Sequence, residues 1–151
     1  MDEVPVSLYI IGNFTVDSVG AKEVKYKSTG NEKSFYTVVL CVTADGGKCD
    51  PMVIFKRKTI PKEGFPKGIV VKANPSGWMT EEIFIEWLSL VWKRRKNSFF
   101  NKKSILIFDS MTAHITERSK SEANRLSTLA VIPKGLTKKL QPLVLTINRS
   151  F

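Results

Sequence analysis

The sequence predicts a mixed α/β fold, in which a β-sheet is flanked by helices. Strand-like segments fill the first half of the chain, and helical and strand-like segments alternate in the second half. This order is typical of a mixed sheet rather than of a helical bundle or a β-sandwich. The 151 residues fit one domain, and 42% hydrophobic with 25% charged residues is close to globular averages. No apolar run approaches the roughly 20 residues that a membrane-spanning helix needs.

Strands are predicted throughout the first half. A short strand is expected at Ala21–Lys27, and a stronger one at Phe35–Ala44. The second segment is β-branched, aromatic and almost continuously apolar, as in a strand buried on both faces. The turn residues Asp45-Gly46-Gly47 end it. Further strands are expected at Pro51–Lys56 and Gly68–Lys72.

The clearest helix is expected at Thr80–Lys93. Thr80 can cap its first turn, and the negative charges of Glu81 and Glu82 interact favourably with the positive end of the helix dipole. Apolar side chains at helical spacing form one stripe: Ile83, Phe84, Trp87, Leu88 and Val91. We interpret this stripe as a core-facing surface rather than a platform for stacking bases.

The second half continues with short elements. Ser104–Phe108 is a compact buried strand that ends at Asp109, and Leu129–Ile132 is another. A helix with a weak apolar face is expected at Glu117–Ser127 between them. Leu143–Phe151 begins an apolar segment that we expect to start a C-terminal helix.

The chain is basic, with 24 Lys and Arg against 14 Asp and Glu, a net charge of +10. The excess lies after residue 50, mainly in four clusters: Lys56-Arg57-Lys58, Lys93-Arg94-Arg95-Lys96, Lys102-Lys103 and Lys138-Lys139. Such clusters suit a polyanion, because each cation that meets a phosphate releases counterions. They equally suit a solvated surface, so charge alone leaves nucleic-acid binding open.

The two cysteines and the single histidine limit the kinds of redox and metal site that we expect. Cys41 and Cys49 form no CxxC pair, so reduced thiols in a cytosolic or nuclear setting are expected. His114 is the only imidazole, which makes a tetrahedral zinc site improbable. His114 can act as a general base, orient a carboxylate or simply pack in the core.

Acidic residues give the strongest indication of a site. Asp109 follows a buried strand, at the sheet edge where ligands commonly bind; the alternative is a turn or helix cap. A magnesium site needs two or three convergent carboxylates. Asp2 and Asp109 can supply two from neighbouring strands. No Asp or Glu follows Glu122, so the C-terminal helix supplies none.

Several motifs, in order along essentially the whole chain, resemble the DDE transposase domain of the pogo group, which includes jerky-type, tigger-derived and centromere-protein-B-like proteins. The motifs are Gly30-x-Glu32-Lys33, Thr37-Val38-Val39-Leu40, Ala44-Asp45-Gly46, Pro51-Met52-Val53-Ile54-Phe55-Lys56, Phe65-Pro66-Lys67-Gly68, Gly77-Trp78-Met79, Leu106-Ile107-Phe108-Asp109-Ser110, Ala113-His114 and Leu140-Gln141-Pro142-Leu143.

The resemblance implies an RNase H-like fold with a triad of aspartates that cuts DNA with Mg²⁺ or Mn²⁺. Asp2 and Asp109 match the first two acids and would be the metal ligands. The third family aspartate directly follows Gln-Pro-Leu, and that position here is Val144. Valine has no oxygen for a metal, so we expect a weak second-metal position and largely lost DNA hydrolysis.

The resemblance also sets expectations for the domain and its partner. We expect residues 1–151 to be one DDE domain without a helix-turn-helix domain. Its first strand is expected to end at Asp2 and to be truncated, and its C-terminal helix is expected to be cut short at Phe151. Nuclear residence and binding to DNA are implied. The candidate DNA-binding residues are Lys56, Arg57, Lys58, Arg94, Arg95, Lys138 and Lys139.

Two alternatives remain open at this point. One is an active Mg²⁺- or Mn²⁺-dependent endonuclease, in which Glu3 or His114 replaces the lost acid. The other is a non-enzymatic interaction module or transposon remnant.

Overall fold

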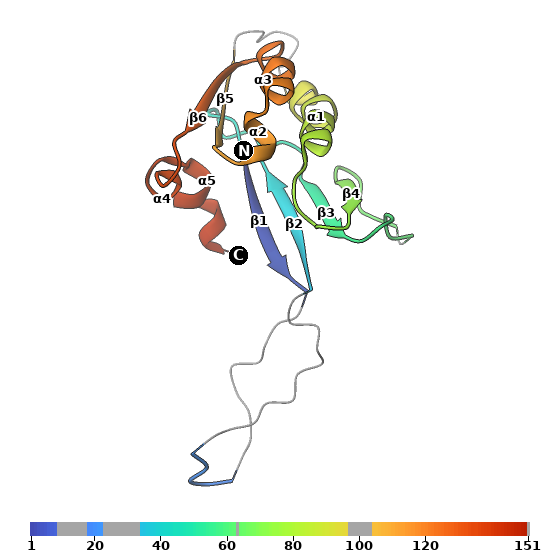
Figure 1. The fold of residues 1–151 in the computed structure, drawn as a ribbon, viewed down its shortest axis with the longest axis vertical. Helices are drawn as coiled ribbons and strands as arrows, with labels where there is room; N and C mark the ends of the chain where they lie inside the picture. The colour runs from blue at the N-terminus through green and yellow to red at the C-terminus, as the bar shows by residue number, and fades with distance from the viewer. Residues whose placement is uncertain (9–17, 23–33, 63, 97–103, 151) are drawn as a thin grey trace.

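The strands form two sheets that share one core. The computed structural model describes residues 1–8, 18–22, 34–62, 64–96 and 104–150 (Figure 1). A four-stranded sheet has the order β1-β2-β3-β4, and a two-stranded sheet contains β5 and β6. The strands are β1 (Asp2–Ser7), β2 (Phe35–Leu40), β3 (Met52–Lys56), β4 (Val70–Asn74), β5 (Ile105–Asp109) and β6 (Thr128–Ile132).

The larger sheet is mixed. β2 is antiparallel to both β1 and β3, whereas β3 and β4 are parallel. β5 and β6 are also parallel. A mixed sheet with helices around it is the predicted α/β class, and it is consistent with an RNase H-like fold.

Short helices follow the strands. They are α1 (Glu81–Leu90), α2 (Thr112–Ile115), α3 (Glu117–Asn124), α4 (Thr137–Leu140) and α5 (Pro142–Leu145), with the 3₁₀ segments η1 (Trp92–Arg94) and η2 (Ile147–Ser150). The predicted cap of α1 is confirmed, because the Thr80 hydroxyl accepts the Ile83 N–H. Among the described residues, no helix is both long enough and apolar enough to span a membrane.

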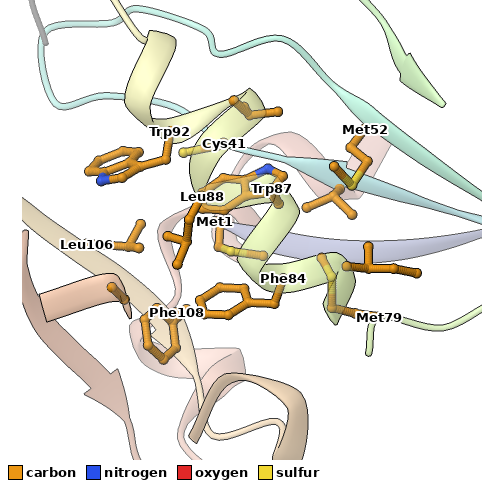
Figure 2. Close-up of a cluster of buried hydrophobic side chains, with 14 of the residues drawn as sticks. Met1, Cys41, Met52, Met79, Phe84, Trp87, Leu88, Trp92, Leu106 and Phe108 are labelled. Atoms are coloured by element: carbon orange, nitrogen blue, oxygen red, sulfur yellow. The ribbon is translucent and has the colours of Figure 1, made fainter. Parts of the chain in front are cut away.

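The core lies where α1 packs against both sheets (Figure 2). Phe84, Trp87 and Leu88 on α1 are almost completely buried, as the apolar stripe predicts. They join Met52 on the larger sheet and Phe108 on the smaller one in a single cluster. The two sheets therefore share one hydrophobic core, for which α1 supplies the largest side chains.

Several predicted boundaries are wrong. β1 begins at Asp2 and runs to Ser7, so the first strand does not end at Asp2. β2 ends at Leu40 rather than Ala44, because the next residues turn back in a hairpin bridged by Val42 and Lys48. α1 ends at Leu90 rather than Lys93, and α3 at Asn124 rather than Ser127.

Other differences affect the chain ends and loops. The C-terminal region forms α5 and η2 as separate short pieces rather than one helix from Leu143. β4 lies two residues later than expected, at Val70–Asn74. The strand expected at Ala21–Lys27 lies largely outside the described residues.

The core packing of Phe84 gives a stability prediction. Phe84→Ala should lower the free energy of unfolding by about 3–5 kcal/mol, because it removes a fully buried ring and leaves a cavity. Phe65→Ala is the matched control, since Phe65 is 37% exposed, and should cost only about 1 kcal/mol. Urea unfolding measures both. Equal costs for the two variants would contradict the assignment of Phe84 to the core.

Candidate active site

The start of β1 and the end of β5 meet beside α2 (Figure 1). β1 supplies Asp2 and Glu3, β5 ends at Asp109, and α2 carries His114. The backbone nitrogen of Met1 donates a hydrogen bond to the carbonyl oxygen of Ile107 at 2.7 Å. Residues more than 100 positions apart in the chain therefore share one site.

His114 lies between two carboxylates. Its Nε2 is 2.8 Å from Oε1 of Glu3, and its Nδ1 is 3.2 Å from Oδ1 of Asp109. The imidazole is fully buried. Its ring packs against Phe84 and Phe108, with centroids 4.8 and 5.2 Å apart. We refer to Glu3, His114 and Asp109 as the acid–histidine triad.

The two carboxylates of the triad determine the protonation state of His114. Burial by itself lowers the pKa of the imidazole, but the hydrogen bonds to Asp109 and Glu3 outweigh it and raise the pKa to about 9. The hydrogen bond from His114 in turn lowers the pKa of Asp109. Ionised carboxylates only accept hydrogen bonds, so both ring nitrogens donate. At neutral pH His114 is therefore an imidazolium.

Local geometry explains how Asp109 and His114 meet. The Oδ1 of Asp109 also accepts the backbone N–H of Met111 at 3.2 Å, which turns the chain directly after β5. α2 begins at Thr112, directly after this turn, and carries His114 within hydrogen-bonding distance of Asp109. The buried Ser119 hydroxyl donates to the Ala113 carbonyl at 2.6 Å and so ties α3 to α2.

Asp2 has different partners. Neighbouring strand residues point to opposite faces, so Asp2 turns away from Glu3. Its Oδ2 accepts a hydrogen bond from the side-chain amide of Asn148, and Gln141 is a second side-chain partner. Burial, with a smaller contribution from Glu3, raises the pKa of Asp2 despite these hydrogen bonds.

The segment that carries Val144 lies beside Asp2. The Gln141 side-chain amide donates to the Met1 carbonyl at 3.0 Å, and Asn148 reaches Asp2 four residues after Val144. Val144 is half-buried in α5. Residues on both sides of Val144 therefore contact Met1 and Asp2, and the assignment of Val144 to the third acidic position stays a prediction.

The structure groups the candidate residues in an unexpected way. Ligand atoms of Glu3, Asp109 and His114 lie within 4.8 Å of one another, and among the described residues no other such group of three His, Cys, Asp or Glu occurs. Asp2 is outside that group. The metal role of Asp2 and Asp109 therefore stays a prediction. Gln141 belongs to the motif Leu140-Gln141-Pro142-Leu143, but nothing in the sequence indicated its hydrogen bond to Met1.

The candidate DNA-binding residues do not form one patch. Figure 1 shows α4, with Lys138 and Lys139, on the other side of the domain from β3, which ends at Lys56. Exposed side chains among the candidates are Lys56, Arg57, Lys58, Arg94, Lys138 and Lys139.

Arg95 is the one half-buried candidate. Its guanidinium lies 4.0 Å from the Trp92 ring centroid and donates to Trp92 O and to the Ser104 hydroxyl. These interactions give Arg95 a structural role in holding η1 against the start of β5, whether or not it meets DNA.

Loss of the central cation should destabilise the domain. His114→Gln should lower the free energy of unfolding by about 3 kcal/mol, because it leaves two neighbouring carboxylates without a positive partner. Urea unfolding at pH 7 measures the loss. The double variant Glu3→Gln/His114→Gln is the control and should recover part of it. A single variant as stable as the wild type would contradict the triad.

The same triad predicts a pH dependence. The folded pKa of His114 is raised from 6.5 to about 9, so its stabilisation is fully present below pH 6.5 and is lost as pH rises through about 9. The difference in unfolding free energy between wild type and His114→Gln should therefore shrink across that window. A difference that stays constant with pH would show that His114 is not a cation in the folded state.

Comparisons with known proteins identify the family of this chain. Residues 33–151 match the family model described as DDE superfamily endonuclease. The chain is 36% identical over 149 residues to the pogo transposable element with KRAB domain of Mus musculus, and equally to that of Homo sapiens. It is 29% identical over 130 residues to the human pogo transposable element with ZNF domain.

The matches cover most of this chain but only a small part of each relative. The first two matches cover 98% of this chain but 24% of the relative, and the third covers 85% and 9%. The chain thus spans about a quarter of the length of the KRAB-domain relatives. No solved structure matches significantly. With the family model covering most of the chain, this protein belongs to the DDE superfamily endonucleases, as a pogo-group transposase-derived domain.

Proposed function

We propose that this domain binds duplex DNA and has lost most of the metal-dependent nuclease activity of its family. DDE superfamily endonucleases are generally dependent on divalent metals. The observation that carries the proposal is the donor set: the third acidic position is Val144, and the acid nearest to Asp109 is tied to a protonated histidine.

The residues present do not fit a two-metal centre. Such a centre needs carboxylates that bridge and flank both ions. The protonated His114 has no lone pair to offer, and its Nε2 holds Glu3 at 2.8 Å. Asp2, on the opposite face of β1, accepts a hydrogen bond from the side-chain amide of Asn148. Asp109 alone keeps a partly exposed carboxylate at the strand end, with 27% of its side chain accessible.

An active endonuclease is the second candidate. It is favoured by the same triad, because Glu3, Asp109 and His114 place three potential donor atoms within 4.8 Å of one another. This function requires His114 to lose its proton when a metal binds, against the two hydrogen bonds that raise its pKa to about 9. We therefore favour the impaired domain.

DNA binding is supported by charge and by family. The net charge of +10 and six exposed cations among the candidate residues can meet phosphates without a defined base-reading element. We further propose that the protein acts in the nucleus, where DNA is available to it. The separate positions of the basic clusters suit binding at several points along a duplex rather than one recognition groove.

The nuclease proposal predicts little plasmid nicking. Wild type with Mn²⁺ or Mg²⁺ should nick supercoiled plasmid no faster than Asp109→Ala, because the third acid is absent. Metal-dependent nicking by wild type that Asp109→Ala abolishes would overturn the proposal and favour the active enzyme. Val144→Asp returns the missing carboxylate, and nicking gained by this variant assigns the loss to that position.

The DNA proposal predicts salt-sensitive, sequence-tolerant binding. Fluorescence anisotropy with a labelled duplex should show an affinity that falls steeply with salt and changes little between duplex sequences. Lys138→Glu/Lys139→Glu should weaken binding and reduce the salt slope by about one for each lysine that no longer meets a phosphate.

The control for this measurement has the same change in net charge. Lys22→Glu/Lys48→Glu reverses two lysines outside the four basic clusters. Binding that is absent, or that does not depend on salt, would contradict DNA binding. Equal weakening by both double variants would contradict the role of α4.

A further inference from the structure

Cys41 and Cys49 face each other across the hairpin that joins β2 to β3. The hairpin is bridged by Val42 and Lys48, and the backbone N–H of Cys49 donates to the Cys41 carbonyl at 3.0 Å. Cys41 and Cys49 are therefore directly opposite residues of an antiparallel pair. Both are free thiols in the structure.

The backbone geometry of this pair suits a disulfide. Opposite residues joined by backbone hydrogen bonds have Cα atoms about 5.5 Å apart. Disulfides are found at Cα separations of about 4.4–6.8 Å, so this spacing is near the centre of the range. The two thiols also influence each other, since Cys49 is the main cause that lowers the pKa of Cys41.

The two sulfurs differ in access and reactivity. Cys41 is 4% exposed but lines a cavity of about 670 Å³, together with Arg95 and Lys96. Cys49 is half-buried on the hairpin. The neighbouring Cys49 thiol and, to a smaller extent, nearby positive charge that includes Arg95 lower the pKa of Cys41, against the effect of burial. Thiolates are the reactive form of cysteine, so Cys41 is the nucleophile and Cys49 the resolving thiol.

We propose that Cys41 and Cys49 form a reversible intramolecular disulfide by exchange with a low-molecular-weight disulfide, such as oxidised glutathione. The Cys41 thiolate attacks one sulfur of that disulfide, forms a mixed disulfide and expels one glutathione thiolate. Cys49 loses its proton to solvent, attacks the Cys41 sulfur and expels the second glutathione. The protein loses two electrons and two protons, and the small disulfide gains them.

The disulfide would close a small loop between the end of β2 and the start of β3. A cross-link stabilises a fold mainly by restricting the unfolded chain, so the oxidised protein should melt several degrees higher than the reduced one. The disulfide depends only on the hairpin and the cavity, so it would form whether or not the domain binds or cuts DNA.

The test uses the whole chain in buffers of increasing oxidised-to-reduced glutathione ratio, below its unfolding temperature. Free thiols are trapped by alkylation and the protein is analysed by mass spectrometry and peptide mapping. Wild type should lose both alkylatable thiols together, as a monomer that carries a Cys41–Cys49 link and no glutathione. Dithiothreitol should restore both thiols, and the oxidised form should have the higher melting midpoint.

Cysteine variants separate the two roles. Cys49→Ser should stop at a mixed disulfide between Cys41 and glutathione, whereas the matched Cys41→Ser should react more slowly at Cys49. Neither variant should gain melting temperature under oxidising conditions. Wild type in which both thiols stay alkylatable, end as mixed disulfides, or link different molecules would overturn the proposal, and this result needs no variant to fold.

Discussion

A buried imidazolium connects the two sheets of this domain. Glu3 at the start of β1 and Asp109 at the end of β5 both accept hydrogen bonds from His114, whose ring is sealed by Phe84 and Phe108. Desolvating these charges costs free energy that only well-placed partners can offset. The triad therefore couples the position of β1 to that of β5, and α1 covers the junction with its aromatic side chains.

The same triad relates stability to the proposed loss of chemistry. A histidine that holds two carboxylates as a cation stabilises the fold, but it occupies oxygens that a divalent ion would need. On the other side of β1, Asn148 and Gln141 engage Asp2 in a second polar cluster. Under the proposed loss of nuclease activity, with Val144 in the third position, these acids stabilise the fold instead of holding metal ions.

A charged side chain in a basic run is not automatically available to DNA. Arg95 stacks on Trp92 and joins a polar chain in which the Trp92 indole donates to Ser127, and Ser127 hydrogen-bonds to Ser104. Lys56 places its ammonium group 5.1 Å from the Phe35 ring centroid. Such interactions use the long aliphatic stems of both residues, and the planar guanidinium of Arg95, to cover apolar surface. Charge clusters therefore overstate the free binding surface.

The sequence alone determined the α/β class, most strands, and the start of α1 with its Thr80 cap and apolar stripe, because these features depend on local periodicity and capping. It did not determine the end of α1, which lies at Leu90 rather than Lys93. It also singled out Asp2, Asp109 and Val144. Only the tertiary structure decided that Glu3, rather than Asp2, meets His114 and Asp109. That choice depends on which face of β1 each side chain occupies and on pairing across more than 100 residues, which no local pattern records.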